Sequence, residues 1–145
     1  MLALIICSLL SATITGKVVS VHDEDTITVL QDSTQIKVRL AEIDAPELKQ
    51  AFGQRARQAL GERLQGKQVR VEWEKRDKYG RTLGTVYLGE ESINLWQVRN
   101  GWAWQYKQYS KSETLKRAEE QARKEKVGLW QDVNPVPPWE WRKKK

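Results

Sequence analysis

The most informative stretch of the sequence is VRLAEIDAPE, residues 38–47, in which three acidic side chains follow an alternating apolar run. Alternation of apolar and basic residues up to Leu40 is typical of a half-buried strand. Pro46 lacks the N–H that a strand ladder needs, so we expect the strand to end near Asp44. Carboxylates this close repel one another unless solvent or a cation lies between them. The pattern therefore predicts a cluster of acids at a strand end.

A second acidic group, DED at residues 23–25, lies in a turn-prone segment between two predicted strands. If adjacent strands bring this turn to the strand end, Asp25 approaches Asp44 and Glu47. Carboxylate oxygens without nitrogen or sulfur ligands favour hard cations such as Ca²⁺ or Mg²⁺. So few protein ligands would leave positions for water and substrate oxygens. Acidic hairpin turns are also common on protein surfaces, so DED alone does not define a metal site.

Two arginines add a second kind of chemistry. Arg39 lies in the predicted strand, where alternation points it away from the buried face, and Arg81 follows the turn DKYG at the start of another strand. Planar guanidinium groups near a hard cation can clamp a phosphodiester and stabilise the charge of its transition state. An ion pair with Asp77 in a surface turn is the alternative for Arg81.

Other chemistries lack the residues they need. The sequence has one histidine, His22, and one cysteine, Cys7, and neither lies in a zinc-binding or triad-like context. It also has no phosphate-binding glycine loop and no dinucleotide-binding motif. The formal net charge of +6 favours a polyanionic partner, although the same charge could serve only solubility.

The elements that must position these side chains follow from apolar periodicity and turn residues. A helix is predicted near residues 50–65, and a later helix would begin at a capping box formed by Ser110 and Glu113. The remaining predicted elements are strands at 14–21, 26–31, 35–41, 67–74 and 82–88, and helices at 93–100 and 112–126. This order predicts an α+β fold, a five-stranded OB-fold β-barrel with about three α-helices. An open five-stranded sheet with helices on one face is the alternative.

The ends of the chain differ from this central domain. Residues 1–12 contain an apolar run that is shorter than the ~20 residues of a membrane span and typical of a signal peptide, so we expect export to the periplasm or the medium. The fit is imperfect, since no basic residue precedes the run, and a buried first strand is the alternative. We expect one folded domain over residues 13–132 and a Pro/Trp/basic tail over 133–145, extended at its start, which could brace the barrel while residues 142–145 stay solvated. The sequence implies no membrane anchor and no protein partner, and a monomer is expected.

Five segments together resemble the staphylococcal nuclease (thermonuclease) family in order and spacing. They are DEDTITV, VRLAEIDAPE, DKYGRTLGTVYL, INLWQVRNGWA and AEEQARKEKVGLW, and they span roughly residues 14–132. On this basis the chain is identified as a secreted-type, single-domain bacterial member. The resemblance implies an OB-fold, Ca²⁺-dependent endonuclease that hydrolyses single-stranded or frayed DNA and RNA to 3′-phosphate ends without discriminating the sugar.

The resemblance also implies roles for individual residues. Asp25 and Asp44 would be calcium ligands together with the carbonyl of Ala45, and Glu47 would orient or deprotonate the attacking water. Arg39 and Arg81 would form the phosphate clamp. The other substrate contacts would be Lys78, Tyr79, Tyr106 and Tyr109, and either Tyr106 or Tyr109 could be the tyrosine that contacts the nucleotide.

Two positions depart from the family pattern. Glu24 stands where the family often has glycine, and Ala45 stands where some members have threonine.

A non-catalytic OB-fold nucleic-acid-binding module is the alternative function. A pure binding module has no need for the complete set of acids and arginines, so we predict an active enzyme.

Overall fold

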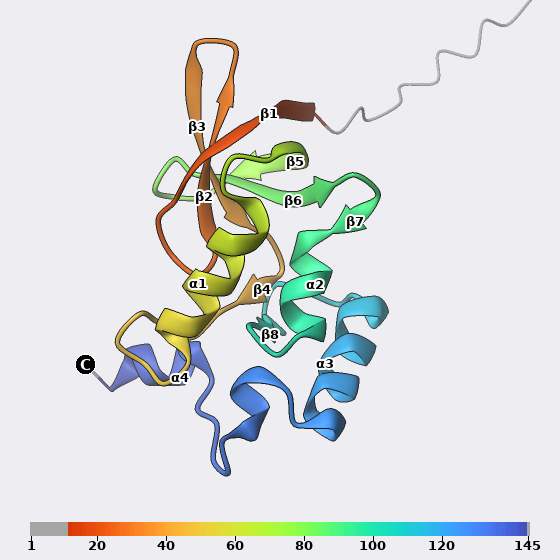
Figure 1. Cartoon of the computed structure of the whole chain (residues 1–145). Helices are drawn as coiled ribbons and strands as arrows, with labels where there is room; N and C mark the ends of the chain where they lie inside the picture. Colours follow the sequence, from red (N-terminus) through yellow and green to blue (C-terminus); the bar gives the residue numbers. More distant parts are fainter. Residues whose placement is uncertain (1–11, 145) are drawn as a thin grey trace, which may run out of the picture.

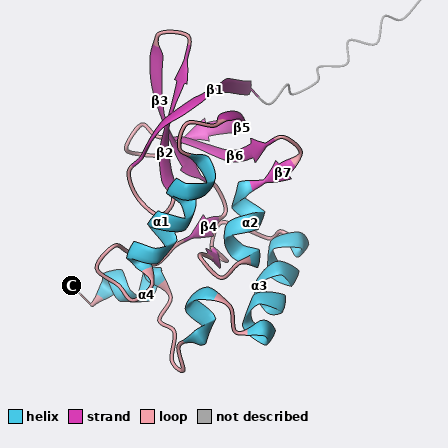
Figure 2. Ribbon diagram, viewed as in Figure 1, coloured by secondary structure: helices cyan, strands magenta, loops and turns pink. Residues whose placement is uncertain are grey.

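Five strands of the computed structural model, which describes residues 12–144, close into a β-barrel (Figures 1 and 2). They are β1 (Ala12–Val21), β2 (Thr26–Gln31), β3 (Thr34–Leu40), β5 (Gln68–Arg76) and β6 (Thr82–Leu88). Antiparallel pairing gives the order β3-β2-β1-β5-β6, and a parallel contact between β3 and β6 closes the ring. The predicted five-stranded barrel is confirmed, and the open-sheet alternative is wrong.

Alternate apolar residues along the strands fill the barrel interior, and helix α1 (Gly53–Leu64) adds to the same core. From α1, Leu60 and Leu64 lie on one stripe of the helix and are fully buried. The fully buried strand residues include Val18, Ile27, Val29, Val38, Leu40, Val71 and Val86. Because this core fixes the strands, the strand ends at the rim of the barrel hold polar side chains in defined positions.

The second half of the chain is mainly helical. It contains α2 (Ile93–Arg99), α3 (Glu113–Glu125), the 3-10 helix η1 (Gly128–Gln131) and α4 (Pro138–Lys143), with short strands β4 (Ile43–Asp44), β7 (Glu91–Ser92) and β8 (Trp104–Gln105). Figure 1 shows α2 and α3 side by side below the barrel, and the tail that carries α4 lies beside the loop that precedes α1. None of the helices between residues 12 and 144 is both long and apolar enough to cross a membrane.

The start of α3 corrects one prediction. Ser112, not Ser110, is the N-cap of α3, and its hydroxyl accepts a hydrogen bond from the backbone N–H of Leu115 at 3.1 Å. Ser110 is buried and instead donates to Glu42 Oε1 at 2.9 Å and accepts from the side chain of Gln105 at 3.1 Å. Ser110 therefore ties the β3–β4 turn to β8 rather than opening the helix.

A glycine pair joins the end of α2 to the start of η1. Gly101 and Gly128 both have positive φ, of 74° and 55°. A Cβ at Gly101 would lie 2.2 Å from the carbonyl oxygen of Val127, and one at Gly128 would lie 2.2 Å from the carbonyl oxygen of Gly101. Only glycine allows both this conformation and this close backbone approach.

The chain ends differ from the predictions in one respect that matters for the site. The proposed signal peptide lies almost entirely outside the described residues. The tail is not extended throughout, because residues 138–143 form α4 with Pro138 at its first turn, a position that suits proline. The tail folds back against the loop before α1 and against β8, and the prediction that Arg142 stays solvated is wrong.

Candidate active site

Barrel closure brings the predicted acids and arginines together at one rim of the barrel. The antiparallel β2–β3 register places Thr26 opposite Arg39, so Asp25, just before β2, lies at the level of Arg39. The parallel β3–β6 contact pairs Arg39 with Leu83, which brings the start of β6 and Arg81 to the same region. Residues that are far apart in the sequence therefore meet because β3 has a neighbour on each side.

Arg39 lies between the two carboxylates that the sequence assigned to a metal. One terminal nitrogen of Arg39 is 3.3 Å from Asp25 Oδ2 and 3.6 Å from Asp44 Oδ1. The guanidinium also donates to the backbone carbonyl of Ile43 at 2.9 Å and to that of Leu40. Because the Arg39 side chain is only 11% exposed and that of Asp44 1%, solvent screens these charges weakly. Arg39 thus holds Asp25 and Asp44 together.

Arg81 is connected to this cluster through a hydroxyl group. One Arg81 terminal nitrogen lies 3.3 Å from Thr26 Oγ1, and that hydroxyl is 3.0 Å from Asp25 Oδ1. The Arg81 Nε donates to Asp77 Oδ2 at 2.7 Å. The turn ion pair is therefore present, and it aims Arg81 at the acid cluster rather than away from it.

Asp77 is itself held by the turn that delivers Arg81. Its Oδ1 accepts from the backbone N–H groups of Tyr79 and Arg81, each at 2.9 Å. Burial acts to raise the pKa of Asp77, but these hydrogen bonds and the Arg81 guanidinium outweigh it and lower the pKa. Asp77 is thus ionised at neutral pH and positions Arg81.

Glu47 follows Pro46 and lies beside Asp44, where both carboxylates contact an arginine that sequence reasoning missed. Arg142 of α4 is 2.7 Å from Asp44 Oδ2 and 3.2 Å from Asp44 Oδ1, and it donates to Glu47 Oε1 at 2.8 Å. Burial raises the pKa of Asp44 even though the hydrogen bonds and charge of Arg142 and the charge of Arg39 act to lower it. The hydrogen bonds to Asp44 in turn raise the pKa of Arg142.

Glu24 adds a fourth carboxylate to the region. It is buried, and its pKa is raised to about 8, first by burial and then by the neighbouring charge of Asp25. Its Oε2 atom is buried without a hydrogen-bond partner. Gln97 of α2 donates to the Glu24 backbone carbonyl at 2.8 Å and so attaches the loop of residues 23–25 to α2.

The acidic residues fit a hard divalent cation with few protein ligands. Residues 12–144 contain no group of three or more His, Cys, Asp or Glu side chains arranged to hold a metal ion. Two buried carboxylates, Asp25 and Asp44, do converge on one Arg39 nitrogen, and a partnerless buried carboxylate oxygen of Glu24 lies in the same loop. Hard cations accept such oxygen donors and complete their coordination with water and substrate oxygens.

The predicted substrate residues lie in two groups. Lys78 and Tyr79 lie at the exposed tip of the β5–β6 turn, where the Tyr79 side chain is 73% exposed and Arg81 packs 5.5 Å from its ring centre. Tyr106 lies beside the acids, with its hydroxyl 3.5 Å from Arg142, whereas Tyr109 is 63% exposed and meets the Tyr106 ring edge-on at 4.8 Å. The geometry brings Tyr106 to the site and leaves Tyr109 at its margin.

Two buried polar residues of α2 were also missed. Asn94 accepts from the backbone N–H of Val86 at 3.0 Å and donates to the backbone carbonyls of Ala41 and Gly84 at 2.9 and 3.1 Å. Together with Gln97, it ties α2 to the loops that carry the acids. The sequence did contain one indication of this role: two polar residues three positions apart on an otherwise apolar helix face, a spacing that places their side chains next to each other.

Fold and site together define a class of protein: a helix-flanked OB-fold barrel with paired carboxylates and two arginines at its rim. Residues 37–132 match the family model described as staphylococcal nuclease homologue. An uncharacterized endonuclease of Haemophilus influenzae is 46% identical over 130 residues, which cover 89% of this chain and 73% of that protein. A micrococcal nuclease of Shigella flexneri is 43% identical over 139 residues, covering 88% and 80%. An uncharacterized endonuclease of Escherichia coli is 44% identical over 137 residues, covering 94% and 90%. The chain belongs to the staphylococcal nuclease family.

Proposed function

We propose that the chain is a metal-dependent nuclease that hydrolyses phosphodiester bonds in DNA and RNA. The observation that carries this proposal is the single network in which Arg39 holds Asp25 and Asp44 together while Arg81 reaches Asp25 through Thr26. The names of the relatives, endonuclease and micrococcal nuclease, support the same class of reaction.

In the proposed mechanism the side chains of the cluster divide metal binding, water activation and charge stabilisation among them. Asp25 and Asp44 would hold a divalent cation with the carbonyl of Ala45, and the bound cation would polarise the phosphoryl oxygens and neutralise their charge. Glu47 lies next to this pair and orients the attacking water or removes its proton. Arg81 and Arg39 donate to the phosphate oxygens as charge grows in the transition state.

We also propose Ca²⁺ as the preferred cation, single-stranded or frayed strands of either sugar as substrate, and 3′-phosphate ends as product. The oxygen-only donors support the cation. The net charge of +6 and the exposed aromatic rings of Tyr79 and Tyr109, on which bases can stack regardless of sugar, support the substrate. Membership of the family is the support for the product ends. The apolar run at residues 1–12 supports export of the enzyme.

The test is cleavage of denatured DNA and of RNA by the full chain with Ca²⁺, with Mg²⁺ or with a chelator. We expect Ca²⁺-supported cleavage that the chelator abolishes and that Asp25→Asn lacks. Glu72→Gln is the matched control, because it removes one half-exposed acid from the outer wall of β5. Salt-sensitive binding without cleavage under every condition would instead make the chain a nucleic-acid-binding module.

A further inference from the structure

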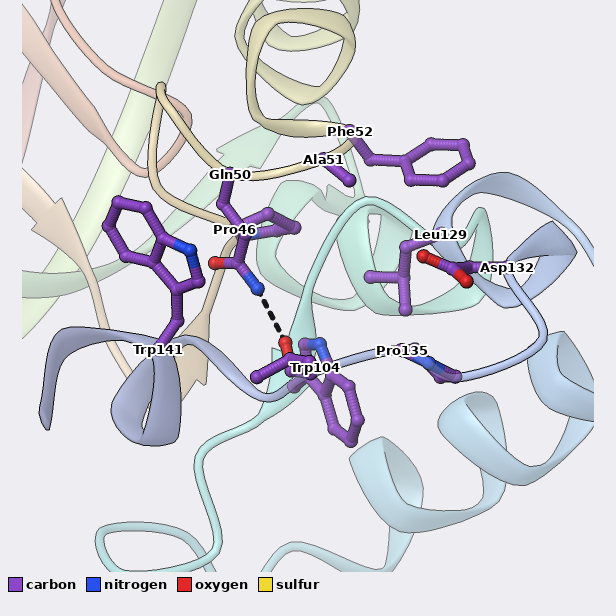
Figure 3. Close-up of a pocket in the computed structure, with 10 residues that line it drawn as sticks. Pro46, Gln50, Ala51, Phe52, Trp104, Leu129, Asp132, Pro135 and Trp141 are labelled. Carbon is purple, nitrogen blue, oxygen red and sulfur yellow. Dashed lines mark hydrogen bonds between the residues drawn. The ribbon is translucent and has the colours of Figure 1, made fainter. Parts of the chain in front are cut away.

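The C-terminal strap, residues 133–144, lies directly over the proposed active site. Trp139 stacks on Tyr106 with ring centres 5.4 Å apart and an interplanar angle of 7°, and meets the Trp104 ring edge-on at 5.6 Å. Gln50, in the loop between Glu47 and α1, donates to the backbone carbonyl of Val136 at 2.5 Å (Figure 3). The strap is therefore attached on both sides of the acid cluster.

Three features favour release of the strap, although Trp139 packs against a buried cluster that includes Trp104 and Trp130. A cavity of about 170 Å³ lies between it and the loop before α1, and Figure 3 shows Pro46, Trp104 and Leu129 facing Pro135 and Trp141 around this space. Helix α4 has only six residues, too few to be stable without its contacts. The Arg142 side chain remains 36% exposed. The packing therefore allows the strap to leave without opening the barrel.

Arg142 uses the oxygens on which the proposed chemistry depends. Its two terminal nitrogens contact both carboxylate oxygens of Asp44 and one oxygen of Glu47, at 2.7 to 3.2 Å. A divalent cation on Asp44 would compete with Arg142 for the same two oxygens, and a water on Glu47 would have only the second Glu47 oxygen left free of Arg142. The two positive charges would also repel each other at this separation, which favours displacement of Arg142 by a bound cation. Arg39 competes less directly, because it contacts Asp44 only at 3.6 Å and donates its hydrogen bond to the backbone carbonyl of Ile43.

We propose that the strap is a built-in competitor for the catalytic cation: with the strap closed, Arg142 neutralises Asp44 and Glu47, and a divalent cation must displace it to open the site. The inference rests on the proposed function, because it concerns the same carboxylates. It makes Arg142 an inhibitory residue rather than a substrate contact. A strap that is closed 90–99% of the time would weaken the apparent cation affinity by about 10–100-fold.

The experiment is calorimetric titration of Ca²⁺ alone into the full chain and into Arg142→Ala. We expect Arg142→Ala to bind Ca²⁺ about 10–100-fold more tightly than wild type and to need correspondingly less Ca²⁺ for half-maximal DNA cleavage. Lys143→Ala is the matched control, because Lys143 is next in the sequence, carries the same charge and pairs only weakly with Glu140 at 3.5 Å. Its Ca²⁺ affinity should equal that of wild type.

A second measurement follows the strap itself. Hydrogen–deuterium exchange of residues 133–144 in wild type should become faster when Ca²⁺ is added, because the N–H groups of Glu140 and Trp141 lose their bonds to the Pro137 carbonyl. Trp139→Ala loosens the strap without touching a carboxylate, so it should also tighten Ca²⁺ binding. This variant serves if Arg142→Ala fails to fold.

The outcomes separate the two proposals. Ca²⁺ affinity in Arg142→Ala and Trp139→Ala that is equal to or weaker than wild type would overturn the strap, while cleavage by wild type would keep the nuclease. Slower cleavage by Arg142→Ala without tighter Ca²⁺ binding would likewise overturn it and make Arg142 a substrate contact. If wild type and both variants neither bind Ca²⁺ nor cleave, the proposed function fails and the strap fails with it.

Discussion

Replacing Arg81 with alanine should slow hydrolysis far more than it weakens the fold. An arginine that donates to a phosphoryl group only in the transition state contributes about 3–4 kcal/mol, so kcat should fall by about 10²–10³-fold. The stability term is smaller, because the ion pair between Arg81 and Asp77 lies in a turn where both side chains, 28% and 14% exposed, keep contact with solvent. Loss of such a pair costs about 0–1 kcal/mol, which lowers Tm by roughly 0–4 °C in a domain of this size.

The assay is kcat and KM on denatured DNA at saturating cation, together with thermal unfolding of each variant. Arg70→Ala is the matched control, because it removes the same charge from the outer wall, where Arg70 packs 4.5 Å from the Tyr87 ring centre and 3.5 Å from Glu72. Its kcat should stay near wild type. If Arg81→Ala keeps kcat within about threefold of wild type, the phosphate-clamp role is wrong.

Three further predictions concern the turn, the helix start and the polyanion surface. The lowered pKa of Asp77 contributes stability that is fully present above its ordinary value of 3.8 and is lost as the pH falls through the lower folded value. The difference in unfolding free energy between wild type and Asp77→Asn should therefore shrink as the pH falls below 3.8. A difference that stays constant until the protein unfolds in acid would contradict this. In Gly53→Ala the new Cβ would lie 1.9 Å from the carbonyl oxygen of Glu47, so we expect about 1–3 kcal/mol of destabilisation in urea unfolding together with lower activity. Gly61→Ala in the same helix has no atom within 4 Å of the new Cβ and should stabilise by about 0.5–1 kcal/mol; equal effects of the two changes would refute the close-approach argument. Binding to single-stranded DNA, measured without cation, should weaken with a log–log salt slope of about −0.7 for each phosphate neutralised, and a flat response would exclude the polyanion surface.

The barrel could be predicted from the sequence because its information is local. Segments such as 26–31 and 82–88 are rich in β-branched residues and follow turn-prone residues, and the observed β2 and β6 have these same bounds. The acid cluster could also be predicted, because carboxylates that come just before or just after a strand lie at the rim of the barrel. What periodicity alone left open was closure, which depends on the parallel β3–β6 contact between segments more than 40 residues apart.

The sequence allowed a tail that braces the barrel, but the contact of this tail with the acid cluster could not be predicted, because it is entirely long-range. The segment NPVPPWEWRKKK is typical of an exposed, proline-rich, basic end. Arg142 is ordered by Asp44 and Glu47, which are 98 and 95 residues earlier in the chain. Asn94 and Gln97 escaped prediction for the same reason, because their partners are backbone groups of distant loops. A polar side chain in a helix does not reveal which remote carbonyl or carboxylate it will meet.

The buried acids connect the two proposals. An ionised carboxylate that is 1% exposed, as Asp44 is, destabilises the fold strongly unless cations and hydrogen bonds surround it. Arg39 contacts one side of Asp44 at 3.6 Å, a distance too long for a direct hydrogen bond, so it leaves much of that charge uncompensated. A second positive group, either Arg142 or a divalent cation, stabilises the charge on the remaining side. A protein that keeps Asp44 charged for catalysis therefore has a physical reason to provide its own guanidinium for the state without the cation.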